Sequence, residues 1–439
     1  MSDLRDVVIV DGVRTPFVKA GADFKGIRAH QLGRIPLREL LERLDITDGQ
    51  SAKSRVKVDE VCFGNVANPE DAANITRVIA MLAGLDRSIS AYTVHRNCAS
   101  GMEAIGQAWV KIGAGHSDVM MVGGVESMSN LPLIYGPEMT AFFINLMRAR
   151  SLGQRLGTLL SFRLSFLKPI IAVEQGLMDP FCGLNMGQTT ENIARDFGIT
   201  REEQDRFALE SHRRALEAME SGKMAEEITP VAIPMKYTQI VKDDIGPRKG
   251  QTIEQLKKLK PFFDRVNGTV TVGNACPITD GAVAVAVMSA DKAKSAGYKP
   301  LGKIRSVAFA GLEPERMGLG PVFAMHKALQ KAGLSMRDMD IIEINEAFAA
   351  QVIGVMRASS SKKFCEERLG MSEALGEIDP AKLNVNGGAI AFGHPVGASG
   401  ARIVLTALKE LKRRGKRFAI ASLCIGGGQG GAVVVEREE

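Results

Sequence analysis

The chain has 439 residues, 45% of them hydrophobic and 24% charged, which is typical of a folded protein with more than one domain and excludes extensive disorder. Its net charge of +6 suits an anionic, phosphate-bearing substrate but is too small to indicate nucleic-acid binding. Six widely spaced cysteines without a CxxC pair indicate neither a disulfide framework nor a metal site. We therefore expect a reducing compartment.

The first third of the chain alternates short apolar runs with segments of helical spacing. We predict strands at Val7 to Val10 and Glu60 to Phe63, and helices at His30 to Leu44 and Asn74 to Ala83. The first strand starts so early that we expect no signal or transit peptide, which favours the cytoplasm. Alternation of this kind predicts a mostly parallel sheet covered by helices.

The next feature is Cys98, which follows the extended run Ser90 to Val94 and precedes a segment of small residues with helical spacing. A turn before a helix presents backbone N–H groups, so we expect it to favour a thiolate at Cys98. Taken alone, the residue fits a buried packing cysteine better, because free cysteines are among the most buried residues.

The middle of the chain, 131–267, differs in character from the parts on either side. Within it, residues 140–173 carry five basic residues and no acidic one, interleaved with large apolar side chains. A basic amphipathic segment can lie on an anionic membrane surface or dock on a partner subunit. It can equally be an excursion folded over the protein's own active site, and the sequence leaves the three alternatives open.

The pattern around Cys98 recurs near the C-terminus. Ala-Ser-Gly occurs at 99–101 and at 398–400, each at the start of a predicted helix. Each helix is followed by a buried strand that runs into glycines, at 118–124 and at 418–428. We interpret this as an internal duplication, with two similar α/β halves placed face to face.

Three uncommon residues lie in glycine-rich turns at strand or helix ends: Cys98, His394 and Cys424. If the halves pack symmetrically, these side chains converge. A cysteine beside an imidazole is a good nucleophile near neutral pH, and a second cysteine can transfer a proton. Asn345 follows a predicted strand, Asp340 to Ile344, and can hold a water or donate a hydrogen bond there.

Four motifs, in this order along the chain, resemble those of the thiolase family: Asn97–Gly101, Asn345–Phe348, Gly387–Pro395 and Cys424–Gly428. The resemblance covers essentially the whole chain. It implies an α/β fold of two duplicated halves in layers αβαβα, with an inserted loop domain. The implied domains are an N-terminal half, 1–130 plus about 268–292, a loop domain, 131–267, and a C-terminal half, 293–439.

The resemblance also implies the chemistry. Cys98 would attack a 3-ketoacyl-CoA, His394 would activate it, and Cys424 would transfer the protons of the acetyl-CoA enolate and of coenzyme A. One oxyanion hole would combine His394 with a water held by Asn345, and the other the backbone N–H groups of Cys98 and Gly426. Coenzyme A is then a substrate, and no cofactor is bound permanently.

Coenzyme A binding, in the family pattern, falls on four further residues. Arg248 would stand near the adenine, whereas Met186 and Phe348 would line the pantetheine tunnel. Cys276 occupies a position that is often serine, which weakens the expectation of a hydroxyl contact there.

The chain mixes features of different thiolases. Asn185 stands where short-chain biosynthetic thiolases tend to carry histidine, and Asn185–Gly187 with the basic insertion resembles the β subunit of trifunctional fatty-acid oxidation complexes. Those subunits, however, often have histidine at the position of Asn345. We expect a degradative 3-ketoacyl-CoA thiolase that forms a homodimer or tetramer. A hydratase/dehydrogenase α subunit is a candidate partner, and a membrane surface is one of the three open alternatives for residues 140–173.

Three alternatives remain at this point. The first is a biosynthetic acetoacetyl-CoA thiolase that runs the Claisen condensation. The second is a decarboxylating or 3-hydroxy-3-methylglutaryl-type condensing enzyme, against which Cys424 argues because those relatives usually lack the second cysteine. The third is a catalytically inactive CoA- or lipid-binding homologue, which would have lost at least one of Cys98, His394 and Cys424.

Overall fold

The computed structural model of the protein describes residues 4–234 and 237–438. The chain divides into two compact units. The first, which we call the body, consists of Met1–Asn130 and Asp179–Glu439, and the second, which we call the arm, is Leu131–Met178. The division assigns 179–267 to the body, and the predicted boundaries of two halves and a loop domain stay a prediction. None of the described helices is both long enough and apolar enough to cross a bilayer.

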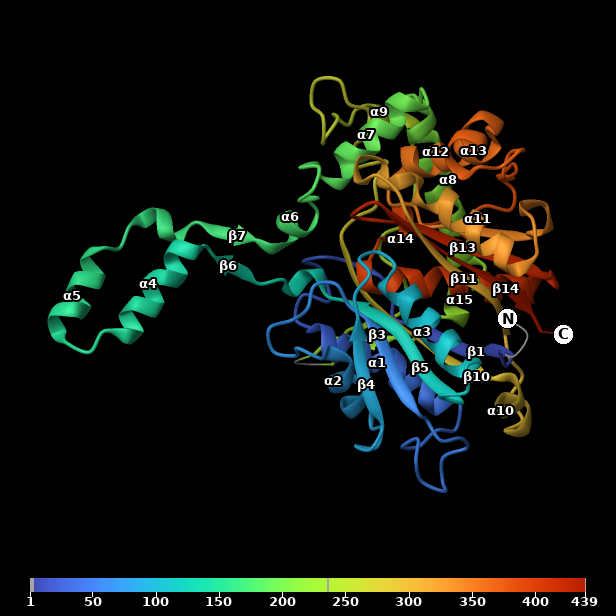
Figure 1. The fold of residues 1–439 in the computed structure, drawn as a ribbon, viewed down its shortest axis with the longest axis horizontal. Coiled ribbons are helices and arrows are strands. Elements are labelled where there is room, and N and C mark those ends of the chain that lie inside the picture. The colour runs from blue at the N-terminus through green and yellow to red at the C-terminus, as the bar shows by residue number, and fades with distance from the viewer. Residues whose placement is uncertain (1–3, 235–236, 439) are drawn as a thin grey trace. The chain divides into compact units, whose positions relative to one another are not determined.

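A ten-stranded sheet forms the centre of the body (Figure 1). Its order is β12-β13-β14-β11-β1-β10-β5-β3-β4, with β2 added on β10. The strands β1 and β11 pair only at Val8–Lys303 and Ile9–Gly302, so the sheet consists of two halves joined at a short contact. The strands are β1 (Val7–Arg14), β2 (Val18–Lys19), β3 (Glu60–Gly64), β4 (Ser90–Val94), β5 (Val119–Glu126), β10 (Thr279–Ser289), β11 (Gly302–Gly311), β12 (Ile341–Ile344), β13 (Phe418–Ile425) and β14 (Gln429–Arg437).

The two halves repeat one topology. The strands β1, β10, β5 and β3 are joined by two antiparallel pairings and then a parallel one. The strands β11, β14, β13 and β12 are joined by the same three pairings in the same order. The internal duplication predicted from the sequence is therefore confirmed.

The prediction of a mostly parallel sheet is wrong. Among the strand pairs that the described residues form, only β3–β4, β3–β5 and β12–β13 are parallel. The last strand of each half enters between two others in the antiparallel sense, and β13 returns directly into β14 through Gly426 to Gly428. Two strands joined by a short hairpin must pair antiparallel. The alternation of helices and strands in the sequence predicts parallel pairing only for strands that are joined through a helix.

Helices complete five layers, as the fold class predicts. The helices α3 (Ser100–Gly113) and α15 (Val396–Arg414) lie between the two half-sheets, α1 (Ala29–Arg43) and α2 (Ile75–Ala83) cover the outer face of the first, and α11 (Gly320–Ala332) covers the outer face of the second (Figure 1). The strands β5 and β10 are buried along their full length because helices cover both of their faces.

The remaining helices and two short strands lie outside these layers. Asn185 and Thr200 cap α7 and α8 in capping boxes with Gln188 and Glu203, which explains where these helices begin. The elements are α7 (Met186–Asp196), α8 (Arg201–Glu220), α9 (Ile253–Lys257), α10 (Ala290–Ser295), α12 (Ala349–Ser360), α13 (Lys362–Leu369), α14 (Ala389–Phe392), β8 (Val231–Ala232) and β9 (Ile240–Val241).

The arm is a hairpin with its own elements. Its base is the antiparallel pair β6 (Leu133–Tyr135) and β7 (Pro169–Ile171). Between them lie α4 (Pro137–Arg148) and α5 (Leu152–Leu160), and α6 (Ala172–Gly176) follows β7. Pro137 at the first turn of α4 and Ser151 as the cap of α5 explain where these helices begin.

Candidate active site

The two helices of the middle layer touch at their N-terminal turns. A Cβ on Gly101 of α3 would lie 2.8 Å from the Gly397 carbonyl oxygen, and a Cβ on Gly400 of α15 would lie 2.6 Å from the Met102 nitrogen. Only glycine permits so close an approach of two backbones. Gly101 and Gly400 are the last residues of the two Ala-Ser-Gly tripeptides. The turns that precede α3 and α15 therefore lie side by side.

Cys98 lies on a tight turn two residues before α3. Asn97 has a φ of 43°, and the Ser100 hydroxyl donates to the Asn97 carbonyl (2.7 Å) and accepts from the Arg96 N–H (2.9 Å). The N–H groups of Gly426 and of Cys98 itself face the sulfur, but burial outweighs them and raises the pKa of the thiol. The expectation that this turn favours a resting thiolate is wrong, because it neglected the cost of desolvation.

His394 is held by the second serine of the repeat. Its Nδ1 lies 2.6 Å from Ser399 Oγ, and the Ser399 hydroxyl donates to the Pro395 carbonyl (3.1 Å). This pattern assigns the ring hydrogen to Nδ1 and leaves Nε2 as an acceptor. The buried Nε2 has no hydrogen-bond partner among the described residues, and burial, with Arg402 nearby, lowers the pKa of His394 to about 4. The imidazole is therefore neutral and able to accept a proton.

Two further thiols lie near Cys98. Cys424, one residue from the end of β13, has its pKa raised well above the usual value by burial and by the neighbouring thiols of Cys98 and Cys276. Burial and Cys98 likewise raise the pKa of Cys276 to about 12. The next residue, Pro277, accepts a hydrogen bond from the His394 N–H (3.3 Å). The structure thus gathers Cys98, Cys276, Cys424 and His394.

Asn345 follows the end of β12, beside the end of β13. Its N–H donates to the Ser422 carbonyl (3.0 Å), which fixes it against the strand that carries Cys424. The side-chain amide is fully buried, and neither its oxygen nor its nitrogen has a hydrogen-bond partner among the described residues. A buried amide in this situation is suited to bind a water or a ligand oxygen.

Of the residues predicted to bind coenzyme A, Met186 and Phe348 lie beside the thiols. They share an apolar cluster with Cys424, and the Met186 sulfur lies 3.2 Å from where a Gly426 Cβ would be. Cys276 is tied to the same segment because its N–H donates to the Ala347 carbonyl (3.0 Å). Arg248 lies elsewhere: it is exposed, and its side chain contacts Gln251.

Glu126 supports the site from the end of β5, and the sequence analysis missed it. Its carboxylate accepts hydrogen bonds from the N–H groups of Gly397 (2.9 Å), Ala67 (3.0 Å) and Val66 (3.1 Å). It thereby caps the N-terminal turn of α15, and burial raises its pKa to about 7. The available signal was a carboxylate directly after an apolar, glycine-containing strand.

Glu346 fixes the segment that leads to His394. Its carboxylate accepts from the Ser211 hydroxyl (2.6 Å), the Asn384 amide (2.8 Å) and the Ile390 N–H (3.2 Å). The sequence analysis also missed this residue, although it lies within the Asn-Glu-Ala-Phe motif. Its buried position beside α14 explains why a charged residue stands between Asn345 and an apolar pair.

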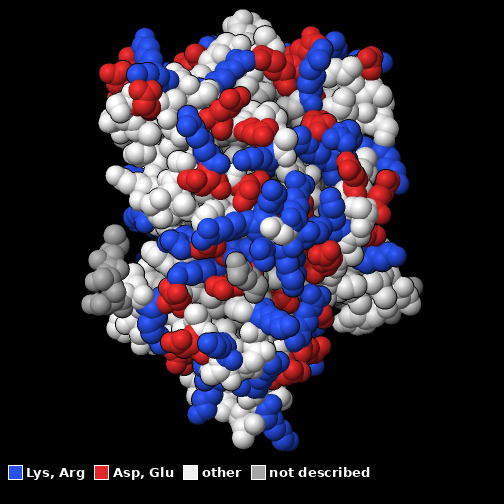
Figure 2. All heavy atoms as spheres, turned by 90° about the vertical axis from the view of Figure 1, so that its right-hand side faces the viewer, with Lys and Arg blue, Asp and Glu red and all other residues white. Residues whose placement is uncertain are grey.

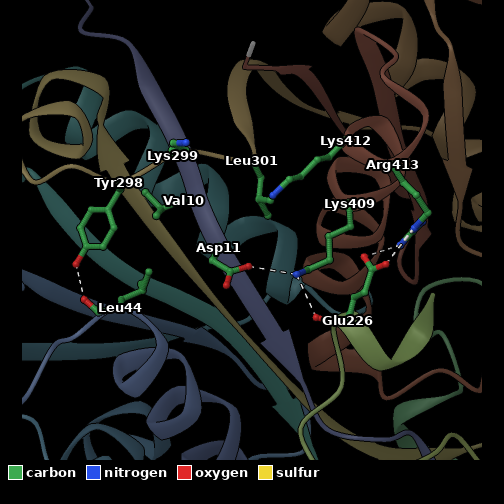
Figure 3. Close-up of a pocket in the computed structure, with 10 residues that line it drawn as sticks. All are labelled: Val10, Asp11, Leu44, Glu226, Tyr298, Lys299, Leu301, Lys409, Lys412 and Arg413. Atoms are coloured by element: carbon green, nitrogen blue, oxygen red, sulfur yellow. Dashed lines mark hydrogen bonds and ion pairs between the residues drawn. The ribbon is translucent and has the colours of Figure 1, made fainter. Parts of the chain in front are cut away.

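A crevice of about 540 Å³ lies at the other end of α15, at Lys409 to Arg413 (Figure 3). Its charges are partly paired: Lys409 with Asp11 (3.2 Å) and Arg413 with Glu226 (3.0 Å). One face of the molecule shows the same mixture, with basic side chains gathered across its middle and carboxylates among them (Figure 2). The crevice contains none of the predicted site residues. Among residues 4–234 and 237–438, no three His, Cys, Asp or Glu side chains are grouped as metal ligands.

Family models match almost the whole chain: "Thiolase, N-terminal domain" at residues 7–291 and "Thiolase, C-terminal domain" at residues 298–437. The chain belongs to the thiolase family. It is 41% identical over 431 residues to a 3-ketoacyl-CoA thiolase of Pseudoalteromonas translucida, covering 98% of this chain and 96% of the relative. It is 40% identical to a 3-ketoacyl-CoA thiolase of Yersinia pestis, covering 98% and 97%.

Solved thiolase structures share the fold. The acetyl-CoA acetyltransferase of Bacillus anthracis superposes with a TM-score of 0.85 at 36% identity, covering 100% of both chains. The human mitochondrial 3-ketoacyl-CoA thiolase superposes with a TM-score of 0.84 at 35% identity, again over 100% of both. The layered α/β architecture predicted for a thiolase is thus confirmed, and structural similarity alone does not separate the relative named acetyl-CoA acetyltransferase from the relative named 3-ketoacyl-CoA thiolase.

Proposed function

We propose that this thiolase is a 3-ketoacyl-CoA thiolase, which cleaves 3-ketoacyl-CoA with coenzyme A into acetyl-CoA and a shortened acyl-CoA in fatty-acid β-oxidation. The observation that carries the proposal is the meeting of the α3 and α15 turns, which gathers Cys98, His394 and Cys424. Relatives named 3-ketoacyl-CoA thiolase at about 40% identity over nearly the full chain support the choice of substrate.

In the first half-reaction, Cys98 attacks the 3-keto carbon while its proton passes to Nε2 of His394. Burial raises the pKa of Cys98 and lowers that of His394, so both groups rest neutral and the proton moves as the bond forms. The bond between C2 and C3 then breaks, leaving a thioester on Cys98 and the enolate of acetyl-CoA. Cys424 donates its proton to C2, and acetyl-CoA leaves.

In the second half-reaction, coenzyme A takes over the acyl group. The Cys424 thiolate accepts the proton of the incoming thiol, whose sulfur attacks the thioester carbon on Cys98. The Cys98 sulfur leaves and recovers the proton held by His394. Every group returns to its starting protonation state, and the shortened acyl-CoA is released.

Each negative charge that develops during the reaction has hydrogen-bond donors nearby. The N–H groups of Cys98 and Gly426 face the sulfur and suit the tetrahedral oxyanion that forms there. We propose that the enolate oxygen accepts hydrogen bonds from His394 and from a water held by Asn345. The buried amide of Asn345 has no hydrogen-bond partner among the described residues. Loss of one such donor costs on the order of a hundredfold in rate.

Coenzyme A binding is assigned to four residues. Met186, Phe348 and Cys276 border the thiols and suit the pantetheine arm. Arg248, exposed and apart from them, suits the distal nucleotide phosphates by its charge. The human relative was solved in complex with CoA, which supports coenzyme A as the ligand of this fold.

The experiment is a thiolysis assay across chain lengths, with Cys98→Ala as the blank. We expect activity on 3-ketoacyl-CoA chains well beyond acetoacetyl-CoA, and none in the variant. Thiolysis confined to acetoacetyl-CoA would instead identify the biosynthetic alternative, which the Bacillus anthracis acetyl-CoA acetyltransferase favours. Activity remaining in Cys98→Ala would refute the nucleophile, and inactivity of the native protein on every substrate would indicate a CoA-binding homologue without chemistry.

For assembly and compartment we propose a cytoplasmic homodimer or tetramer that works with a hydratase/dehydrogenase α subunit, with residues 140–173 as the part that contacts a membrane. The relatives named 3-ketoacyl-CoA thiolase support the metabolic setting. Sedimentation of the purified chain, alone and with such an α subunit, measures both associations. A monomer that never sediments with the α subunit contradicts them.

A further inference from the structure

One face of α15 is polar although the helix runs through the interior of the body. The side chains on this face are buried and follow one another at spacings of three or four residues, which places them in one row: Ser399, Arg402, Thr406 and Glu410. Ser399 is bonded to His394, whereas Thr406 and Glu410 are bonded to side chains of other elements. Arg402 is the exception in this row.

The guanidinium of Arg402 is buried without a counter-ion. The residue is 2% exposed, it forms no salt bridge with any described residue, and its Nε has no hydrogen-bond partner among them. Arg14, which is also buried, is paired with Glu227 and Asp244, each at 2.7 Å. A buried charge without a partner destabilises a fold, so the presence of Arg402 points to a role in function rather than in stability.

The carboxyl groups that face Arg402 do not neutralise it. Glu343 lies on β12, and burial raises its pKa to about 8 even with Arg402 nearby, so this carboxyl holds its proton at neutral pH. Burial raises the pKa of Glu346 as well, and the three hydrogen bonds that its carboxylate accepts come from other residues. The positive charge of Arg402 therefore acts on its surroundings without compensation.

Arg402 lies one helical turn from the residue that orients the catalytic base. Side chains of an α-helix lean towards its N-terminus, so the guanidinium reaches back over the turn that carries Ser399. Ser399 Oγ lies 2.6 Å from Nδ1 of His394, and the charge of Arg402 acts on the same ring. A cation in this position opposes a second positive charge on the imidazole.

The other titratable groups around His394 are acids, and burial raises the pKa of each. The neighbouring thiols keep their protons for this reason: Cys98, Cys276 and Cys424. Glu126, beside the first turn of α15, has a pKa of about 7. Asp280, on β10, also has a raised pKa and accepts from the Ser129 N–H (2.9 Å). A guanidinium cannot lose its proton, so Arg402 is the permanent charge among these groups.

We propose that Arg402 is a positioning residue of the thiolase reaction, whose fixed positive charge keeps His394 unprotonated at rest and leaves Nε2 free to take the proton of Cys98. The inference rests on the role of His394 as base, proposed above. The same repulsion returns the proton from His394 to the Cys98 sulfur when coenzyme A takes over the acyl group. Arg402 itself neither gains nor loses a proton in the cycle.

The test follows the protonation of His394 directly by NMR of the full-length protein labelled with 13C-histidine. The chain has six histidines, and the ring signal that is missing in His394→Asn identifies His394. We expect the native ring to stay neutral down to about pH 5, since its pKa is about 4. Arg402→Met and Arg402→Gln should both raise the titration midpoint by at least about one pH unit, because each removes the charge.

Two further measurements separate an electrostatic role from a structural one. The acid limb of kcat/KM for thiolysis should move upward with the ring midpoint in both variants. The melting temperature of Arg402→Met should not fall, because the substitution removes a buried charge that has no partner. Arg337→Met is the matched control: it removes an exposed arginine and should change neither the midpoint nor the acid limb.

Unchanged midpoints in both variants would overturn the proposal, and so would a shift in Arg402→Met that Arg402→Gln does not share, because hydrogen bonding would then be the cause. A marked drop in the melting temperature of Arg402→Met would show that Glu343 is ionised and paired with Arg402, which also overturns it. If the native protein cleaves no 3-ketoacyl-CoA, the proposed function fails, whereas the ring titration still decides whether Arg402 controls the proton of His394.

Discussion

Two serines from the same repeated tripeptide hold the two halves of the site. Ser100 fixes the turn of Cys98 through Arg96 and Asn97, and Ser399 fixes the ring of His394 through Nδ1. The tripeptide was recognised in the sequence as a sign of duplication. The role of its serine became visible only in the structure, because the sequence does not show which atoms a hydroxyl group hydrogen-bonds to.

Removal of the Ser399 hydroxyl should misorient the base without removing it. We expect Ser399→Ala to lower kcat/KM by about tenfold or more, because Nδ1 loses the partner that sets its tautomer. In the native protein the acid limb of kcat/KM should lie below about pH 5, since the pKa of His394 is about 4.

The control for that variant is Ser306→Ala, which removes another buried hydroxyl bonded to a carbonyl, far from His394 in the sequence and on β11. It should change stability and leave the plateau of kcat/KM intact. Equal losses in both variants, or an acid limb near the ordinary pKa of histidine, would contradict the orienting role.

The contact of α3 with α15 is the packing event that creates the site. Helix starts at Ser100, Met186 and Arg201 follow from local capping and spacing, and the start at Ser100 was predicted to within a residue or two. The pairing sense of the strands was not predicted correctly, because antiparallel insertion of β10 and β14 depends on long-range partners. Gly101 and Gly400 must be glycines because the two helices approach so closely at these positions. The neighbouring residues in the sequence do not show this requirement.

Gly101→Ala should separate the two helix starts. The added methyl would lie 2.8 Å from the Gly397 oxygen and 2.9 Å from the Ala401 nitrogen. We expect a loss of about 1–3 kcal/mol in the free energy of unfolding, and a loss of activity because Cys98 and His394 move apart. Thermal unfolding with a thiolysis assay measures both.

Gly157→Ala is the matched control, since Gly157 also lies within a helix but has open space around it. There alanine should be neutral or stabilising by up to about 1 kcal/mol. Identical behaviour of the two alanine variants would show that the helix contact is more tolerant than the geometry indicates.

The molecule buries carboxylates near the interface of its two halves. Burial raises the pKa of Glu343, on β12, to about 8 and that of Glu126 to about 7. A carboxyl whose folded pKa is raised holds its proton more tightly than in the unfolded chain. Its stabilising contribution is therefore complete below the unfolded pKa and is lost as pH rises through the folded pKa.

The free energy of unfolding should accordingly fall from about pH 4.5, the ordinary pKa of a glutamate, to about pH 8, the folded pKa of Glu343. Glu343→Gln should flatten that fall, because the amide cannot lose a proton, whereas the exposed Glu367→Gln should leave it unchanged. Denaturant unfolding at several pH values measures the slope. An equal slope in the native protein and Glu343→Gln would contradict the assignment.

By itself, the sequence determined the family, the duplication, and the residue types that we propose as nucleophile, base and proton donor. These follow from local signals, since motif order, glycine turns and apolar periodicity are written in neighbouring residues. The all-basic character of residues 140–173 was equally plain.

Only the tertiary structure decided how those groups behave. It showed that Cys98 rests as a thiol because burial outweighs its N–H donors, that His394 is neutral, and that Glu126 and Glu346 support the turns around them. It also showed that the leucines of α5 face outward. The burial of these side chains and the identity of their hydrogen-bond partners depend on segments that lie hundreds of residues apart in the sequence. Local sequence patterns therefore cannot predict them.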